Sequence, residues 1–212
     1  MPELYVITGS NGAGKSSIGS EYVPQYIQSE SAIFDGDKLT LDKINELVAT
    51  RLHSRKEAKS IADVWVQDHF KQSVDHAIKT QGNFAYEGHF RSDAAWEVIK
   101  KKKKKRYIIS MIFFGLVDIE RSRMRVLERA LSGGHDVALH EIDKNYRGNL
   151  IQLDRHYKLL DHLKVFDTSE TSPRLLIDIS DNEILHRVPF IDQPEWVTEQ
   201  LIKICRHLYP EI

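Results

Sequence analysis

The sequence predicts an α/β fold in which a mostly parallel central sheet carries helices on both faces. Residues 4–8 form a β-branched apolar run that ends in a glycine-rich turn, as a strand before a ligand-binding loop does. Residues 107–114 form a nearly continuous apolar run, which is the pattern of a central parallel strand covered on both faces. Segments with helical periodicity separate the predicted strands. We expect one domain over residues 1–212.

The charge balance and the cysteine content limit the classes of function. Thirty basic and 31 acidic residues give a net charge of −1, so no overall field would attract nucleic acid or an anionic membrane. The single cysteine, Cys205, excludes an internal disulfide framework. No apolar run approaches the length of a membrane-spanning helix, and no signal-like segment precedes the first strand. We expect a cytoplasmic protein.

The turn after residues 4–8 carries the pattern G-x-x-x-x-G-K-[ST] of a phosphate-binding P-loop. In such a loop, backbone N–H groups and a helix N-terminus point at one anion. Lys15 is expected to neutralise the β- and γ-phosphates, and the Ser16 hydroxyl to hold a magnesium ion. The strand in front favours a P-loop NTPase or kinase fold over a chance glycine-rich turn. The predicted nucleotide-binding residues are Gly9, Ser10, Asn11, Gly12, Ala13, Gly14, Lys15, Ser16 and Ser17.

Two carboxylates follow predicted strands at the edge where open parallel sheets bind ligands. Asp37 comes just after the strand predicted over residues 32–35, and Glu87 ends the strand predicted over residues 83–87. In a small-molecule kinase, Asp37 can accept the proton of the acceptor hydroxyl while the phosphoryl group moves. The alternative for Asp37 is a turn residue or a helix cap.

Glu87 and the residues after it suit either metal or acceptor binding. The Glu87 carboxylate can hold the magnesium shell through water, or it can bind a polyhydroxylated acceptor. Arg91 can hold an anionic acceptor. His89 is interpreted as a polar loop residue in preference to a chemical group.

An arginine-bearing lid is predicted over about residues 118–150. Arg121, Arg125 and Arg129 share one helical face, and three neighbouring guanidinium groups suit a polyanion such as the phosphates of a nucleotide. Gly133-Gly134 would supply a hinge for closure. The alternative is a solvent-facing helix with Glu120 and Glu128 as salt-bridge partners.

The remaining segments are expected to be structural. Residues 25–31 should form a loop after Pro24, residues 41–81 a helical stretch, residues 138–163 a long helix and residues 175–187 a hairpin. Pro194 should open the terminal helix. The apolar positions expected to make core contacts in the helical stretch are Ile61, Val64, Trp65, Phe70, Val74, Ala77 and Ile78.

The helix predicted over residues 93–105 ends in six lysines, residues 100–105. A nucleic-acid or localisation patch is one interpretation. We favour a solvated helix end, because lysines suit the C-terminal end of the helix dipole and no aromatic residues interleave to stack on bases.

Several of these segments together resemble the zeta-toxin family of P-loop kinases over most of residues 4–170. The matching segments are, in order, the P-loop, residues 34–37, residues 83–87, Arg125-Val126 with Arg129, residues 133–137 and residues 146–150. The resemblance implies a bacterial ATP-dependent kinase that phosphorylates the 3'-hydroxyl of the sugar in UDP-N-acetylglucosamine unless an antitoxin protein blocks its ATP site. It also assigns roles to residues: Asp37 as the base, Lys15, Arg125 and Arg129 as phosphoryl-charge stabilisers, and Glu87 with Arg91 as nucleotide-sugar contacts.

The chain departs from the family pattern at three places. It has Gly88-His89 where the family often carries threonine, and Asn145 where an arginine commonly precedes the tyrosine. Asp167-Thr168-Ser169 keeps an aspartate but lacks the asparagine that often follows it.

The sequence therefore predicts a phosphotransferase that uses ATP and Mg2+ and acts on a nucleotide sugar. One alternative is a kinase for another small metabolite. Another is a P-loop ATPase that acts as a nucleotide-dependent binding or regulatory protein.

Overall fold

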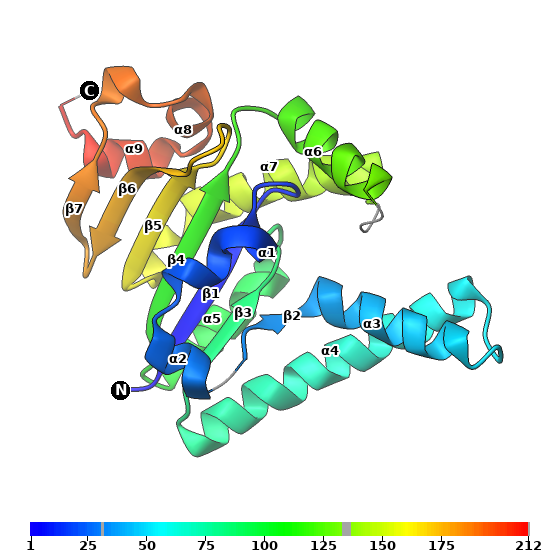
Figure 1. Ribbon diagram of the computed structural model, residues 1–212. Coiled ribbons are helices and arrows are strands. Elements are labelled where there is room, and N and C mark those ends of the chain that lie inside the picture. The colour runs from blue at the N-terminus through cyan, green and yellow to red at the C-terminus, as the bar shows by residue number, and fades with distance from the viewer. Residues whose placement is uncertain (31, 133–136, 212) are drawn as a thin grey trace.

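The computed structural model describes residues 1–30, 32–132 and 137–211 and contains one seven-stranded sheet in the order β2-β3-β1-β4-β5-β6-β7 (Figure 1). Pairs from β2 to β5 are parallel, and β6 and β7 continue the sheet antiparallel. The strands are β1 Glu3–Gly9, β2 Phe34–Asp35, β3 Phe84–Glu87, β4 Ile108–Gly115, β5 His162–Asp167, β6 Arg174–Ser180 and β7 Glu183–Arg187. The prediction of a mostly parallel α/β sheet is confirmed.

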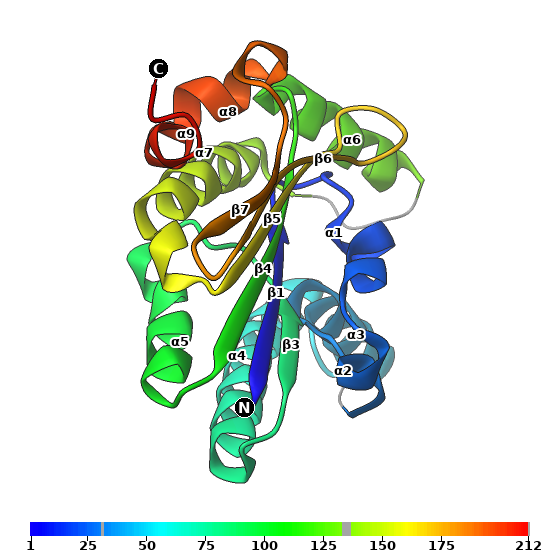
Figure 2. The same cartoon turned by 90° about the vertical axis from the view of Figure 1, so that its left-hand side faces the viewer.

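Helices cover both faces of this sheet. Figure 2, which turns the molecule by 90°, places α5, α7 and α9 on one side and α1 and α2 on the other. The helices are α1 Lys15–Ile18, α2 Gln25–Glu30, α3 Gly36–Ala49, α4 Arg55–Thr80, α5 Asp93–Lys104, α6 Ile119–Leu131, α7 Leu139–His156, α8 Glu195–Gln200 and α9 Ile202–Leu208. Within the described ranges, no helix is both long and apolar enough to cross a membrane.

The central strands explain the apolar runs in the sequence. β4 lies between β1 and β5, and Leu4 and Phe113, on β1 and β4, have no exposed surface. Both faces of β4 are covered, so its side chains do not alternate between apolar and polar. This packing fixes the carboxyl ends of β1, β3 and β4 at one edge of the sheet, where the P-loop begins.

The helical stretch expected over residues 41–81 is two helices, which form a hairpin that projects from the sheet (Figure 1). Ser54 starts α4 with a capping box, in which its hydroxyl accepts from the Glu57 N–H and Glu57 accepts from the Ser54 N–H. The expected core contacts of Val74 and Ala77 are confirmed, whereas Val64 is 61% exposed. Ile61 and Trp65 are also exposed. The outer part of α4 extends beyond the sheet and packs mainly on α3, through a small separate cluster that contains Ile44, Ala58 and Ala62.

Three further boundaries differ from the sequence predictions. The loop expected after Pro24 is wrong, because Pro24 precedes α2 and its carbonyl accepts from the Ile27 N–H at 3.0 Å. The helix expected over residues 138–163 ends at His156, and the rest forms a 3-10 turn and β5. The terminal helix breaks at Leu201 into α8 and α9. The predicted hairpin is confirmed as β6 and β7, joined at Asp181-Asn182 with positive φ at both residues.

The lysine run is not a uniformly solvated helix end. Lys101 pairs with Asp75 at 2.6 Å, and Lys103 pairs with Asp161. Lys102 is fully buried, and its ammonium lies 3.9 Å from the centroid of the Tyr107 ring. Burial lowers the pKa of Lys102 to about 8. The expectation of solvation is therefore wrong for Lys102, because this position continues the helix face that buries Trp96 and Ile99.

Candidate functional site

The P-loop joins β1 to α1 and has the backbone conformation that its glycines allow. Gly9, Gly12 and Gly14 have φ values of 140°, 71° and 88°. At Gly9, an added Cβ would lie 2.1 Å from the carbonyl oxygen of Phe114, so only glycine fits between the two strands. Ser10 and Asn11 are buried, and the hydroxyl of Ser16 and the side chain of Ser17 are exposed. The buried backbone is thereby held rigidly while the mouth of the loop stays open.

Lys15 lies against the backbone of its own loop. Its Nζ donates to the carbonyl oxygens of Ser10 at 2.9 Å and Gly9 at 3.2 Å. Burial lowers the pKa of Lys15, while the charges of Glu87 and Asp37 act in the opposite direction. Lys15 therefore shares one electrostatic cluster with the two carboxylates that the sequence places at the strand ends.

Asp37 and Glu87 reach this edge from neighbouring strands. β2 pairs with β3 so that Asp35 lies opposite Glu87. Asp35 caps α3 by accepting from the Lys38 N–H at 3.0 Å, which leaves Asp37 exposed in the first turn of the helix. The helix-cap alternative thus applies to Asp35 and not to Asp37.

Glu87 contacts the P-loop directly. The Ser16 hydroxyl donates to Oε1 of Glu87 at 2.8 Å. Burial raises the pKa of Glu87, while Lys15 and Ser16 oppose this rise. Hydroxyl and carboxylate oxygens are ligands that Mg2+ prefers, so this pair fits a magnesium ion delivered with a nucleotide. Within the described residues, no cluster of three or more His, Cys, Asp or Glu side chains could hold a metal by itself.

The side chain of Arg91 lies on α7. It forms an ion pair with Glu141 and donates to Oδ1 of Asn145 at 3.0 Å. The hydrogen bonds and charge from Arg91 hold the pKa of Glu141 at about 2. An anionic acceptor would therefore compete with Glu141 for this guanidinium group.

The three arginines of the predicted lid have different settings. Arg121 donates to the Ser169 carbonyl at 2.9 Å, and Arg125 donates to the Thr168 carbonyl at 2.7 Å and the Gly12 carbonyl at 3.3 Å. Arg129 is exposed, and its charge lowers the pKa of Lys15. Arg121 and Arg125 thus hold the loop after β5, whereas Arg129 lies farther along α6.

Helix α6 is tied to its surroundings at its first half. Ser122 donates to the Asn11 carbonyl at 2.6 Å, and Arg123 binds both carboxylate oxygens of Asp143 on α7 at 2.6 and 2.7 Å. Arg123 also pairs with Glu120, so the expected salt bridge of this glutamate forms, with Arg123 as its partner. The predicted hinge and the Gly133-Gly134-His135-Asp136 motif lie outside the described residues.

Sequence reasoning gave no role to two polar residues that hold the P-loop. Asn149 donates to the Gly9 carbonyl at 3.0 Å and accepts from the Phe90 N–H at 2.6 Å. Thr168 donates to the Ala13 carbonyl at 2.9 Å. A pattern in the sequence could have indicated Asn149: it follows Asn145 by one helical turn, and both are buried on a helix that otherwise buries mostly apolar side chains.

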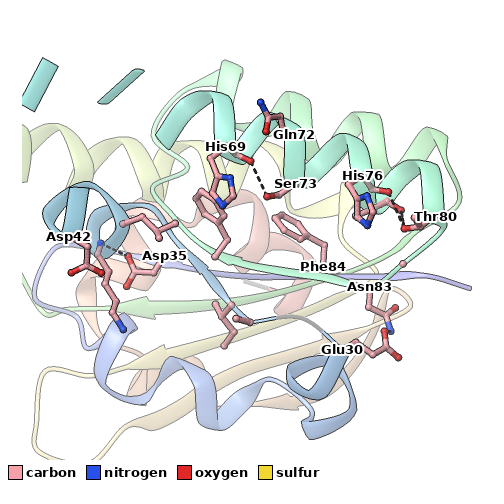
Figure 3. A pocket seen from close by; sticks show the side chains of 17 residues that line it. Glu30, Asp35, Asp42, His69, Gln72, Ser73, His76, Thr80, Asn83 and Phe84 are labelled. Atoms are coloured by element: carbon pink, nitrogen blue, oxygen red, sulfur yellow. Dashed lines mark hydrogen bonds between the residues drawn. The ribbon is translucent and has the colours of Figure 1, made fainter. Parts of the chain in front are cut away.

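Two cavities flank β2. A cavity of about 880 Å3 lies between α4 and the residues 32–35, and His69, Gln72, Ser73 and His76 line it (Figure 3). Its charged lining, Glu30, Asp35 and Asp42 against Lys38, does not suit a diphosphate. A smaller, largely apolar cavity of about 320 Å3 opens beside Glu87. This second cavity adjoins the cluster of Lys15, Asp37 and Glu87 and can receive an acceptor molecule.

The sheet order and the glycine-rich loop after β1 are those of the P-loop kinase fold. The sequence model of the protein family described as Zeta toxin matches residues 1–178, and the chain belongs to this family. This result confirms the resemblance that the sequence motifs indicate. No curated protein matches the sequence.

Solved structures share the fold at low sequence identity. The AvrRxo1-ORF1:AvrRxo1-ORF2 complex with sulphate ions has a TM-score of 0.71 at 13% identity, and the match covers 95% of this chain and 64% of that chain. The same complex with ATP gives 0.67 at 14% identity, with coverage of 87% and 60%. The PezAT chromosomal toxin-antitoxin system of Streptococcus pneumoniae gives 0.61 at 16% identity, with coverage of 99% and 87%. The chain thus spans less than two thirds of the AvrRxo1 chains that it matches.

Proposed function

We propose that this protein transfers the γ-phosphoryl group of ATP to a sugar hydroxyl of a nucleotide sugar, UDP-N-acetylglucosamine. The observation that carries this proposal is the convergence of Lys15, Glu87 and Asp37 beside the P-loop. A loop that binds phosphate, a cation within it and an exposed carboxylate at the same sheet edge are the parts that phosphoryl transfer to an alcohol needs.

The nucleotide side of the site has a built-in scaffold. The P-loop amides and Lys15 would hold the β- and γ-phosphates. Arg125 links the P-loop to the loop after β5, and Thr168 does the same through Ala13. We infer that this doubly anchored loop borders the base of ATP. ATP is also the ligand of the similar AvrRxo1 complex.

Ser16 and Glu87 would hold Mg2+ with the nucleotide. The ion would supply positive charge between the β- and γ-phosphates when bound. Asp37 would accept the proton of the attacking hydroxyl, since its carboxylate is exposed at the carboxyl end of β2. Lys15, Arg125 and Arg129 would stabilise the charge of the phosphoryl group in transit, with Arg129 delivered by a lid that comprises the end of α6.

The acceptor would enter from the side of Glu87. The 320 Å3 cavity offers apolar walls from Phe34, Phe70 and Phe90 for the less polar parts of the sugar nucleotide. If Glu87 does not support the ion, its carboxylate would instead accept hydrogen bonds from the sugar hydroxyls. Arg91 would bind the diphosphate by exchanging its contact with Glu141.

Membership of the Zeta toxin family also supports a protein partner. The PezAT structure is of a toxin-antitoxin system. We infer that an antitoxin protein controls this chain by covering the nucleotide site.

A second acceptor class has support from one observation. Gly88-His89 stands where the family often carries threonine, directly beside the acceptor cavity. This departure favours a kinase for another small metabolite if the nucleotide sugar is not a substrate.

Transfer of radiolabelled γ-phosphate tests these alternatives together. Purified protein, ATP and Mg2+ are incubated with UDP-N-acetylglucosamine, UDP-glucose, free N-acetylglucosamine or a pool of small metabolites. Label on UDP-N-acetylglucosamine alone supports the proposal. Label only in the metabolite pool supports the second acceptor class, and ATP consumption without any labelled acceptor supports a regulatory ATPase.

A further inference from the structure

The ring of His89 fills the space between the P-loop and α7. Its Nδ1 lies 3.2 Å from Nδ2 of Asn149, and its Nε2 lies 3.4 Å from Nδ2 of Asn11. His89 comes two residues after Glu87, at the start of the loop that leads to Arg91. We call residues 88–91 the acceptor-side loop. One side chain of this loop, that of His89, thus contacts both the P-loop and α7.

The orientation of each asparagine follows from its other partners. Asn149 accepts from the Phe90 N–H through Oδ1, so its NH2 group faces Gly9 and His89. Asn145 accepts from Arg91 through Oδ1 and therefore donates to Oδ1 of Asn11 at 2.8 Å. Because Oδ1 of Asn11 is the acceptor in that bond, its NH2 group faces His89.

Both ring nitrogens of His89 therefore face hydrogen-bond donors. A cationic imidazole would present N–H groups to both amides and accept from neither, whereas a neutral imidazole keeps one accepting nitrogen. The ring is thus suited to hold Asn11 and Asn149 in place and not to transfer protons.

We propose that His89 is a positioning residue, whose ring accepts a hydrogen bond from the amide of Asn11 or Asn149, packs against the other amide, and so sets the P-loop relative to the acceptor-side loop. The proposal rests on the proposed phosphoryl transfer, because that reaction joins a group held by the P-loop to one held near Glu87. A displacement of about 1 Å between two such reactants is enough to reduce turnover about 100-fold. His89 would act through its two asparagine neighbours, without contact to the reacting atoms.

Kinetics of three variants test this role. His89→Ala should lower kcat about 10- to 100-fold and leave the KM for ATP within about threefold, since the phosphate-binding groups remain. His89→Gln, which retains hydrogen-bonding groups at similar reach, should recover at least about half of that loss on a logarithmic scale. His186→Ala, at an exposed histidine on β7, is the matched control and should match the parent protein. A raised KM with unchanged kcat, or no recovery in His89→Gln, would overturn the proposal.

A mutant cycle separates positioning from other roles. Asn149→Ala should lower kcat much less in the His89→Ala background than in the parent protein, because the two residues act as a unit. Independent effects of the two substitutions would contradict the proposal. If the parent protein consumes ATP but labels no acceptor, the proposed acceptor fails, and the same comparisons are made on ATP turnover.

Discussion

The hydroxyl of Ser16 donates to the carboxylate of Glu87, with 2.8 Å between Oγ and Oε1. The first residue belongs to the P-loop and the second to the end of β3, which is the direct neighbour of β1 in the sheet. The Ser16 hydroxyl and the Glu87 carboxylate are therefore adjacent because two parallel strands are adjacent. This relationship makes Glu87 the strongest candidate to support a magnesium ion at this edge.

Glu87→Gln should raise the Mg2+ concentration needed for half-maximal activity about 10-fold or more, because the amide keeps the shape but removes the charge. Turnover at saturating Mg2+ should fall less. A magnesium titration of the activity measures both values. Glu120→Gln, at an exposed glutamate on α6, is the control, and an unchanged magnesium requirement in Glu87→Gln would argue for acceptor binding instead.

Asp37→Asn should reduce kcat by about 100- to 10,000-fold, since it removes the group that accepts the hydroxyl proton. Binding of ATP, measured by calorimetry, should stay nearly the same. The comparison variant is Asp35→Asn, which keeps a side chain that can cap α3. The base assignment fails if Asp35→Asn lowers kcat as much as Asp37→Asn does.

Substitutions in α6 should separate binding from catalysis. Arg121→Ala removes the contact to the Ser169 carbonyl and should raise the KM for ATP about 3- to 10-fold with little change in kcat. Arg129→Ala should instead lower kcat about 10- to 100-fold, because this residue would act on the phosphoryl group in transit. Steady-state kinetics with ATP as the varied substrate distinguish the two. Identical kinetic effects of both substitutions would show that the helix works as one unit.

The course of the main chain near the site could be predicted because local patterns determine it. A continuous apolar run of eight residues rich in β-branched and aromatic side chains favours a covered strand, and Gly9 must be glycine because Phe114 lies against it. The reach of α4 could not be predicted from periodicity. Val64 has the spacing of a core residue, yet no sheet lies beneath that part of the helix. Helical periodicity predicts which side of a helix is apolar but not how far its support extends.

The site residues also divide into those that a local motif predicts and those that only the packing of distant segments brings together. Lys15 and Ser16 belong to a contiguous motif, so their placement follows from the eight residues 9–16 of the sequence. Asn149 lies 140 residues from Gly9, whose carbonyl it binds, and only the packing of α7 against the P-loop brings them together. Helical periodicity predicted which face of the helix carries Arg125 but could not predict its partners, because these are carbonyl groups of a loop distant in the sequence.

Lys102 should make stability depend on pH in the alkaline range. Its folded pKa is about 8 against an ordinary 10.5, so the folded state binds the proton less tightly than the unfolded state. The free energy of unfolding should therefore rise between about pH 8 and pH 10.5, in total by about 3 kcal/mol. Below pH 8 the charged amine is buried at full cost.

Lys102→Met should remove this dependence and stabilise the protein by about 2–3 kcal/mol near pH 7. Urea unfolding at several pH values measures the difference from the parent protein, which cancels the titration of other groups. Lys104→Met, at an exposed position of the same lysine run, should have little effect. Equal pH profiles for Lys102→Met and the parent protein would show that Lys102 is not buried as described.

Mass spectrometry of UDP-N-acetylglucosamine after incubation with the protein, ATP and Mg2+ tests the proposed function most directly. Parallel reactions use Lys15→Ala and Asp37→Asn. We predict that the parent protein adds the mass of one phosphate to the sugar nucleotide and that both variants abolish the addition. An unmodified sugar nucleotide in a reaction where ATP is consumed would contradict the proposed acceptor, and unimpaired transfer by Asp37→Asn would contradict the catalytic role given to this carboxylate.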